Sequence, residues 1–224
     1  MGDARVWTRA CYGWNKCTLA LGLMLVVAVA VLATPLRTSL LRSMGDFLVA
    51  TDQLQRADVI VLSVDSDGAG VLEAADLLHE RLSDRVALFA DPPDLVDREF
   101  MRRGVPYHNA AAVSVAQLHE LGIDAVEVIP RSVSGTDDES RDFAAWCEER
   151  NYHRVIFIST IDHSRRSARI LARTTRGHDL KVTVHGSRYS AFRPDAWWQS
   201  RRDVRTEIIE SEKLVADFVF HPLS

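Results

Sequence analysis

One histidine and three arginines lie close together in residues 163–169, and their chemistry is the most specific feature of this chain: His163, Arg165, Arg166 and Arg169. An imidazole exchanges a proton near neutral pH. A guanidinium binds a carboxylate or phosphate through two parallel hydrogen bonds. The group indicates a site for an anionic ligand, with His163 as an acid, a base or a phosphate ligand and Arg166 as the charge clamp.

A predicted strand and a predicted helix position these side chains. Residues 155–158 are four β-favouring apolar residues, as expected for a strand buried on both faces of a parallel sheet. Ser159 and Thr160 end this strand, and Ser164 is the predicted N-cap of a helix that ends near Gly177. Ligands of open α/β sheets bind where strands end and helices begin, so Ser159 is also a candidate ligand-binding residue.

Helical spacing places Arg166, Arg169 and Arg173 on one face of the predicted helix. One interpretation is that Arg166 and Arg169 hold the anion beside the helix N-terminus, whose N–H groups also attract negative charge. The other is a solvated basic face, with His163 serving as a loop cap.

The remaining pattern alternates strands with helices. Strands are predicted at residues 59–62, 86–89, 125–129, 155–158 and 180–185, with helices between them and a last helix at 203–220. Such an alternation predicts an α/β fold with a doubly wound, mostly parallel five-stranded sheet.

Polar residues follow two further strands and would meet the histidine at the same sheet edge. Asp65 and Asp67 follow the first strand. They could accept hydrogen bonds from ligand hydroxyls or hold a cation, and Asp65 could act as a general base. A plain polar turn without a ligand is an equal alternative. Ser134, Thr136 and Glu139 follow the third strand, and Thr136 with Glu139 also matches a helix capping box.

Composition excludes several classes of protein. The net charge of −4 gives no basic field for nucleic acid. The three cysteines provide no disulfide or metal set in the globular part, and the histidines lack ligand spacing, so no structural metal is predicted. The absence of Gly-x-Ser-x-Gly, P-loop and Gly-x-Gly-x-x-Gly motifs counts against a serine hydrolase, a P-loop nucleotidase and a standard dinucleotide enzyme, and no cofactor is identified.

An uncharged apolar run at residues 17–36 predicts a single transmembrane helix, because about 20 helical residues span a bilayer core. A cleaved signal peptide is the alternative. Residues 1–16, with Arg5, Arg9 and Lys16, form the predicted cytoplasmic leader, and the slight excess of basic residues on that side favours an extracytoplasmic C-terminal domain on the cytoplasmic membrane.

Two apolar features have structural explanations. Residues 37–56 form an amphipathic connector that we expect to pack on the domain or lie at the membrane surface. Trp197 and Trp198 precede the last helix; they could stack on a sugar or a base, but packing against that helix or at an interface is the favoured interpretation.

Residues 57–220 resemble the YdcF/SanA-like (ElyC-like) family of bacterial envelope proteins. Four features carry the resemblance. They are Ala57-Asp58-Val59-Ile60-Val61-Leu62 soon after an apolar span, the Ser134-Gly135-Thr136-Asp137-Asp138-Glu139 loop, the Ser159-to-Ala168 segment around His163, and Trp197-Trp198 followed by Glu207, Glu210 and Lys213, which match a Glu-x-x-Lys pattern. The resemblance implies a Rossmann-like domain at residues 57–224 and a role in envelope or polysaccharide metabolism.

Two functions from different classes remain. In the first, the domain binds a phosphorylated or lipid-linked sugar precursor at the His163 edge, and if it is an enzyme it is a hydrolase or transferase acting on that precursor. In the second, a non-catalytic accessory protein contacts envelope polymer-assembly proteins. The His163–Arg166 segment favours the first. The second is favoured by two departures from the family pattern: residues 63–68 lack its glycine-rich turn, and 90–93 lack its Ser-Gly-Gly.

The predicted topology can be tested with a C-terminal reporter that is active only in the cytoplasm. The reporter should stay silent when fused after Ser224, because the span would place the domain outside. Reporter activity would reverse the orientation, and a soluble product that starts near Thr34 would identify a cleaved signal peptide.

Overall fold

A computed structural model describes residues 18–19, 21–27, 36–90, 92–107, 109–130 and 136–222, without the side chains of 110, 136–139, 141 and 142. The chain divides into two compact units, Met1–Met44 and Gly45–Ser224. Half of the predicted span, residues 17, 20 and 28–35, lies outside the described residues. Within the described part, none of the helices combines the length and the apolar character needed to cross a membrane.

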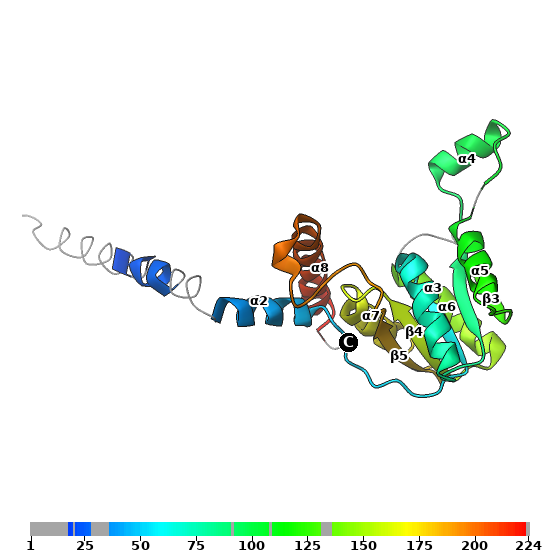
Figure 1. Cartoon of the computed structure of the whole chain (residues 1–224), viewed down its shortest axis with the longest axis horizontal. Coiled ribbons are helices and arrows are strands. Elements are labelled where there is room, and N and C mark those ends of the chain that lie inside the picture. The colour runs from blue at the N-terminus through cyan, green and yellow to red at the C-terminus, as the bar shows by residue number, and fades with distance from the viewer. Residues whose placement is uncertain are drawn as a thin grey trace, which may run out of the picture. The chain divides into compact units, whose positions relative to one another are not determined.

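The second unit is an α/β domain with a five-stranded, all-parallel sheet, as predicted from the sequence (Figure 1). Its strands lie in the order β3-β2-β1-β4-β5. They are β1 (Val59–Leu62), β2 (Val86–Ala90), β3 (Val126–Pro130), β4 (Arg154–Ser159) and β5 (Lys181–Gly186). This architecture is consistent with a Rossmann-like fold.

Helices cover both faces of the sheet. The α-helices are α2 (Leu36–Phe47), α3 (Asp67–His79), α4 (Leu95–Arg102), α5 (Ala110–Glu120), α6 (Thr136–Arg150), α7 (Ser164–Thr174) and α8 (Arg201–Phe220). Short 3₁₀ helices lie at Val64–Ser66 (η1) and Trp197–Gln199 (η2). The α2 helix occupies the first part of the predicted amphipathic connector, and Leu48, just after it, is buried.

The alternation of side chains along each strand separates two hydrophobic cores. Ile60 and Ile156 face the core that α3 and α5 cover. Val61 and Phe157 face the core that α6 and α7 cover. The continuous apolar runs of the central strands are therefore explained by burial on both sides. The edge strand β3 has the least buried pattern of the five.

The sequence predicts a polar loop at residues 63–70, between the first strand and the helix that follows it, but most of this segment is helical. The 3₁₀ turn η1 is closed by the Ser66 hydroxyl, which donates to the Ser63 carbonyl oxygen at 2.7 Å. α3 begins immediately afterwards at Asp67. Gly70 permits this compact arrangement, because a Cβ atom there would lie 2.2 Å from the Ser66 hydroxyl oxygen.

The tryptophan pair packs as the favoured interpretation expected. Trp197 is buried, and the η2 turn that carries it contacts α8. Its ring makes an edge-to-face contact with Trp198 at a centroid separation of 6.1 Å. This arrangement leaves Trp197 with a structural role.

Ile156 in β4 tests the interior position of this strand. Ile156→Asp should unfold the domain, because an unpaired carboxylate at this fully buried position costs several kcal/mol out of a typical stability of about 5–15 kcal/mol. The matched control is Ile208→Asp at an exposed position of α8. Thermal unfolding should distinguish the two variants, and equal melting temperatures would contradict the sheet described above.

Candidate functional site

The carboxyl ends of β1 and β4 form the point at which the order of strands reverses. β2 and β3 lie on one side of β1, and β4 and β5 lie on the other. Open parallel sheets bind ligands at such a switch point. Ser63 follows β1 and Ser159 ends β4, and because Leu62 is paired with Ile158 the two serines are neighbours across the strands. His163 follows within the next turn.

Unpartnered hydroxyl groups surround this edge. Among the described residues, the buried hydroxyl oxygens of Ser63, Ser159 and Thr160 have no hydrogen-bond partner. Ser63 borders a cavity of about 30 Å³, large enough for a single water molecule. A buried hydroxyl without a partner costs about 1–3 kcal/mol. Ser159 and Thr160 are therefore buried polar groups at this edge whose loss of hydration no described residue offsets.

His163 is held by a buried carboxylate from the last helix. Its Nδ1 atom lies 2.6 Å from Glu210 Oε2, and its Nε2 atom lies 3.7 Å from Asp162 Oδ2. Burial alone would lower the pKa of His163, but the Glu210 hydrogen bond and the charges of Glu210, Asp162 and Asp65 outweigh it and raise that pKa. Burial opposes ionisation of Glu210, yet hydrogen bonds from His163 and Lys213 lower its pKa to about 2. The pair is thus an imidazolium and a carboxylate at mildly acidic pH.

The arginines of α7 are paired with carboxylates of α8. Arg166 Nε lies 3.3 Å from Glu210 Oε2. Arg169 and Arg173 both contact Asp217, at 2.6 and 3.0 Å. The basic face is therefore neither solvated nor open for an anion to contact all three guanidinium groups. Arg166 is next to the histidine, whereas Arg169 and Arg173 belong to an ion-pair cluster farther along the helix.

The same contacts give the direction of α8. Glu210 meets the first turn of α7 and Asp217 meets its later turns, so the two helices run in the same direction. Because Glu210 is level with the first turn of α7, the turn of α8 that precedes Glu210 lies beyond the N-terminal end of α7. Glu207 lies there, only 1% exposed, and burial raises the pKa of its carboxyl. Its Oε1 accepts from Ser211, but its Oε2 has no partner among the described residues.

The predicted N-cap of α7 is wrong. Ser164 is the first helical residue, and the residue before it is the N-cap. The Ser164 hydroxyl donates to the Ile161 carbonyl oxygen at 2.8 Å and accepts from the Ala50 N–H at 2.9 Å. Arg165 donates from Nη2 to the Val49 carbonyl oxygen at 2.7 Å. Ser164 and Arg165 thus bind residues 49 and 50, which follow α2, to the first turn of α7. Arg165 is therefore not free to bind a ligand.

The other predicted site residues are described only in part. Asp65 in η1 and Asp67 at the start of α3 have exposed side chains. Thr136 begins α6, so its backbone is at the expected strand-to-helix junction. The side chains of Thr136 and Glu139, and all of Ser134, lie outside the described residues, so the predicted capping box is untested.

Glu210 was missed as a site residue, although its Glu-x-x-Lys spacing with Lys213 is visible in the sequence. The available signal was a row of acids at helical spacing. Asp203, Glu207 and Glu210 are buried on the same face of α8 as Leu214. An acid at a position where an amphipathic helix buries apolar residues requires a cationic or hydrogen-bonding partner. Such a pattern indicates a specific contact.

No known protein family has a model that matches this chain, and no curated protein matches it. Membership of the YdcF/SanA-like family therefore stays a prediction, and the site is defined by its own geometry. Among the described residues, no three or more potential metal ligands come together.

The Glu210–His163 pair gives a pH-dependent test. A carboxyl whose pKa is lowered on folding stabilises the fold at pH values above 4.5, its pKa in the unfolded chain. It loses this contribution as the pH falls towards its folded pKa of about 2. A histidine with a raised pKa stabilises the fold below its unfolded value of 6.5 and loses this contribution as the pH rises through the folded value. The pair should therefore contribute most to the stability of the fold between pH 4.5 and pH 6.5, the two unfolded pKa values.

Glu210→Gln should therefore reduce the free energy of unfolding most at about pH 5.5, and less at pH 3 and pH 8. It should also lower the pKa of His163 measured by NMR. Glu212→Gln, at an exposed position of the same helix, is the control. A His163 pKa that does not change in Glu210→Gln would exclude this pair as the cause of the shift.

Proposed function

We propose that the domain binds a phosphorylated or otherwise anionic cell-envelope or polysaccharide precursor at the switch point between β1 and β4. The observation that supports this best is the set of unpartnered buried hydroxyls, Ser159 and Thr160, beside a histidine whose pKa is raised. These are hydrogen-bond donors without acceptors. The ligand groups that fit them are the oxygens of a phosphate or carboxylate.

The N-terminus of α7 adds to this preference. Its partial positive charge lies directly after His163. The first two N–H groups of the helix are already used, because Ser164 donates to the Ile161 carbonyl oxygen and Arg165 donates to the Leu48 carbonyl oxygen. His163 Nδ1 is committed to Glu210, so Nε2 is the atom available to a ligand. Arg166 sits against the same carboxylate and adds positive charge without being free.

The same geometry is suitable for acid catalysis. A histidine oriented by a buried carboxylate can protonate a leaving oxygen from Nε2, and the exposed Asp65 carboxylate can take a proton from an attacking hydroxyl or water. If the domain is an enzyme, this arrangement supports a hydrolase or transferase acting on a phosphorylated or lipid-linked glycan.

The cellular part of the proposal is supported by the sequence. The uncharged run at residues 17–36 supports a single membrane anchor, and the resemblance to the YdcF/SanA-like family supports an extracytoplasmic role in the envelope.

A non-catalytic accessory role is the second candidate. It is favoured by the pairing of Arg166, Arg169 and Arg173 with Glu210 and Asp217, because these guanidinium groups already have carboxylate partners that an anionic ligand would have to displace. In that role the domain would act through contacts with polymer-assembly proteins.

His163→Gln tests the site directly. Inorganic phosphate and glucose 1-phosphate should perturb the His163 imidazole signals of the parent, and the variant should bind the same probes about 10- to 100-fold more weakly, the scale of a charge-assisted hydrogen bond. His178→Gln is a matched control, because His178 also pairs with a carboxylate, Glu148, but follows α7 at its opposite end. Equal binding by both variants would place the ligand elsewhere.

Ser159→Ala and His163→Gln together separate catalysis from binding. In a catalytic domain, His163→Gln should reduce turnover of a lipid-linked sugar phosphate about 10²–10⁴-fold, whereas Ser159→Ala should mainly weaken binding. In an accessory protein no turnover is measured, and the loss of probe binding should leave envelope assembly unchanged.

A further inference from the structure

Glu207 of α8 is a buried acid for which the described part of the chain provides no cation. The residue is 1% exposed, and its one contact is the hydrogen bond that Ser211 Oγ donates to Oε1 at 3.1 Å. The other buried acids each contact a cationic side chain: Glu73 contacts Arg188, Asp162 contacts His163, Asp203 contacts Arg202 and Glu210 contacts Arg166. Glu207 is therefore the exception among the buried acids that the structure describes.

The surroundings of Glu207 favour the neutral form of its carboxyl. Burial raises the pKa of this group by more than the Ser211 hydrogen bond lowers it. α8 packs against η2, which has no charged side chain, and against α7, whose cations bind Glu210 and Asp217 instead. The neighbours of Glu207 on the buried face of α8 are the acids Asp203 and Glu210, which disfavour a further negative charge.

A neutral carboxyl is a hydrogen-bond donor as well as an acceptor. Because Oε1 of Glu207 accepts from Ser211, the proton belongs on Oε2, the oxygen that has no partner among the described residues. A buried O–H group without an acceptor reduces the stability of the fold, and so does a buried acid without a cation. Groups that reduce stability in this way and have a perturbed pKa are concentrated at functional sites.

Glu207 lies at the level of the loop that carries Thr160 and His163. Glu210 contacts His163 and the first turn of α7, and α7 and α8 run in the same direction. Glu207 precedes Glu210 by one turn on the same face of α8, where Cβ atoms are about 5–6 Å apart. It is therefore level with residues 160–163, where the buried Oγ1 atom of Thr160 also has no described partner. The His163 side chain is 19% exposed, so a ligand would enter on its side.

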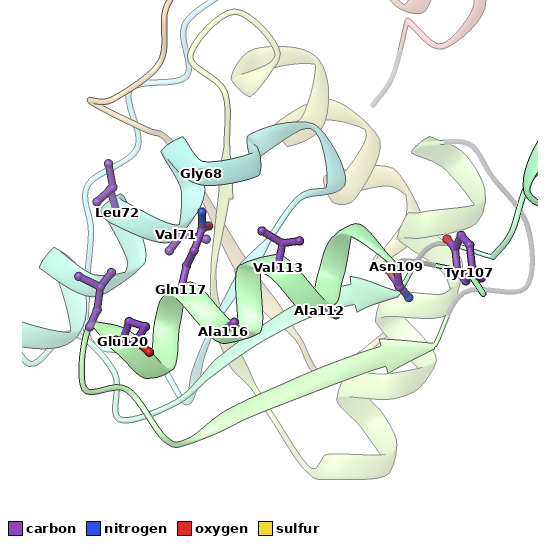
Figure 2. Close-up of a pocket in the computed structure, with 11 residues that line it drawn as sticks. Gly68, Val71, Leu72, Tyr107, Asn109, Ala112, Val113, Ala116, Gln117 and Glu120 are labelled. Atoms are coloured by element: carbon purple, nitrogen blue, oxygen red, sulfur yellow. The ribbon is translucent and has the colours of Figure 1, made fainter. Parts of the chain in front are cut away.

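A large groove elsewhere in the domain has the wrong chemistry for an anion. This groove of about 880 Å³ lies between α3 and α5, and its lining includes Leu72, Val113 and Ala116 (Figure 2). α3 and α5 cover the face of the sheet opposite to that of α7, against which α8 packs. An apolar lining does not replace the hydration of an anion, so an anionic ligand belongs at the His163 edge.

We propose that Glu207 is a further ligand-binding residue of the His163 site, and that its Oε2–H group donates a hydrogen bond to an oxygen of the anionic ligand. This inference rests on the proposed function, because it takes the ligand and its position from there. A carboxylic acid that its site keeps neutral can donate such a bond without adding a negative charge. With the hydroxyls of Ser159 and Thr160, Glu207 would offer phosphate or carboxylate oxygens a third uncharged donor beside the imidazolium.

The protonation state of Glu207 is tested without a ligand, in the full chain purified in a mild detergent. The carboxyl carbon signal that is lost in Glu207→Gln should titrate above pH 4.5, the pKa of this group in the unfolded chain. A carboxyl whose pKa is raised on folding destabilises the fold at pH values above 4.5, and the effect is complete above the folded pKa. Glu207→Gln and Glu207→Met should therefore each raise the free energy of unfolding at about pH 8. Glu212→Gln and Glu212→Met, at an exposed position of α8, are the controls and should not.

Binding is tested with dimethyl phosphate, which keeps a single negative charge as the pH changes. Its affinity for the parent should fall as the pH rises through the measured pKa of Glu207, because a carboxylate replaces the donor and repels the anion. Glu207→Gln keeps an N–H donor, so it should bind within about threefold of the parent at about pH 5 and lose this part of the pH dependence. Glu207→Met has no donor and should bind about 10- to 100-fold more weakly.

His163→Gln separates this inference from the proposed function. If His163→Gln loses binding while both Glu207 variants keep the affinity and the pH profile of the parent, Glu207 is not part of the site and the proposed function stands. If the parent binds neither dimethyl phosphate nor inorganic phosphate, the proposed function fails and this inference fails with it. A Glu207 carboxyl that titrates at or below pH 4.5 would overturn its role as a neutral donor.

Discussion

The parallel pairing of β1 with β4 is the constraint on which the rest of the structure depends. This pairing is what reverses the strand order, because β2 and β3 extend the sheet from one side of β1 and β5 extends it from the other side of β4. It aligns Leu62 with Ile158, and it therefore places Ser63 beside Ser159 at the carboxyl edge. It also divides the apolar side chains of both strands between two cores. The candidate site is a consequence of how these two strands meet.

Buried carboxylates form a second layer of constraint, because each needs a cation or a donor to offset its loss of hydration. Glu210 receives His163, Arg166 and Lys213, and Asp217 receives arginines of α7. Glu73 of α3 is fully buried and accepts from His185 and from Arg188 after β5. These contacts hold α8 against α7 and the segment after β5 against α3. They therefore position the elements that surround the carboxyl edge of the sheet.

Sequence patterns predicted the sheet well, because continuous apolar runs such as residues 155–158 are strongly constrained by burial on two faces. The patterns did not predict features that depend on tertiary contacts. The 63–70 segment has a polar composition, yet the Ser66 hydroxyl and the missing Cβ of Gly70 make it helical. His163 and Ser159 were predicted as site residues from their position at a strand end, and this stays a prediction. The partner of His163 could not be found this way, because Glu210 is 47 positions away and only the packing of α8 brings it there.

The attachment of Ala50 and Val49 to α7 has a mechanical consequence. The backbone that leaves the domain on its N-terminal side is not joined first to the sheet; it is hydrogen-bonded to Ser164 and Arg165, the two residues after His163. Tension applied to the chain upstream of Ala50 would be transmitted to the first turn of α7 before it reached any strand. The imidazole of His163 thus lies at the point where the domain would bear load.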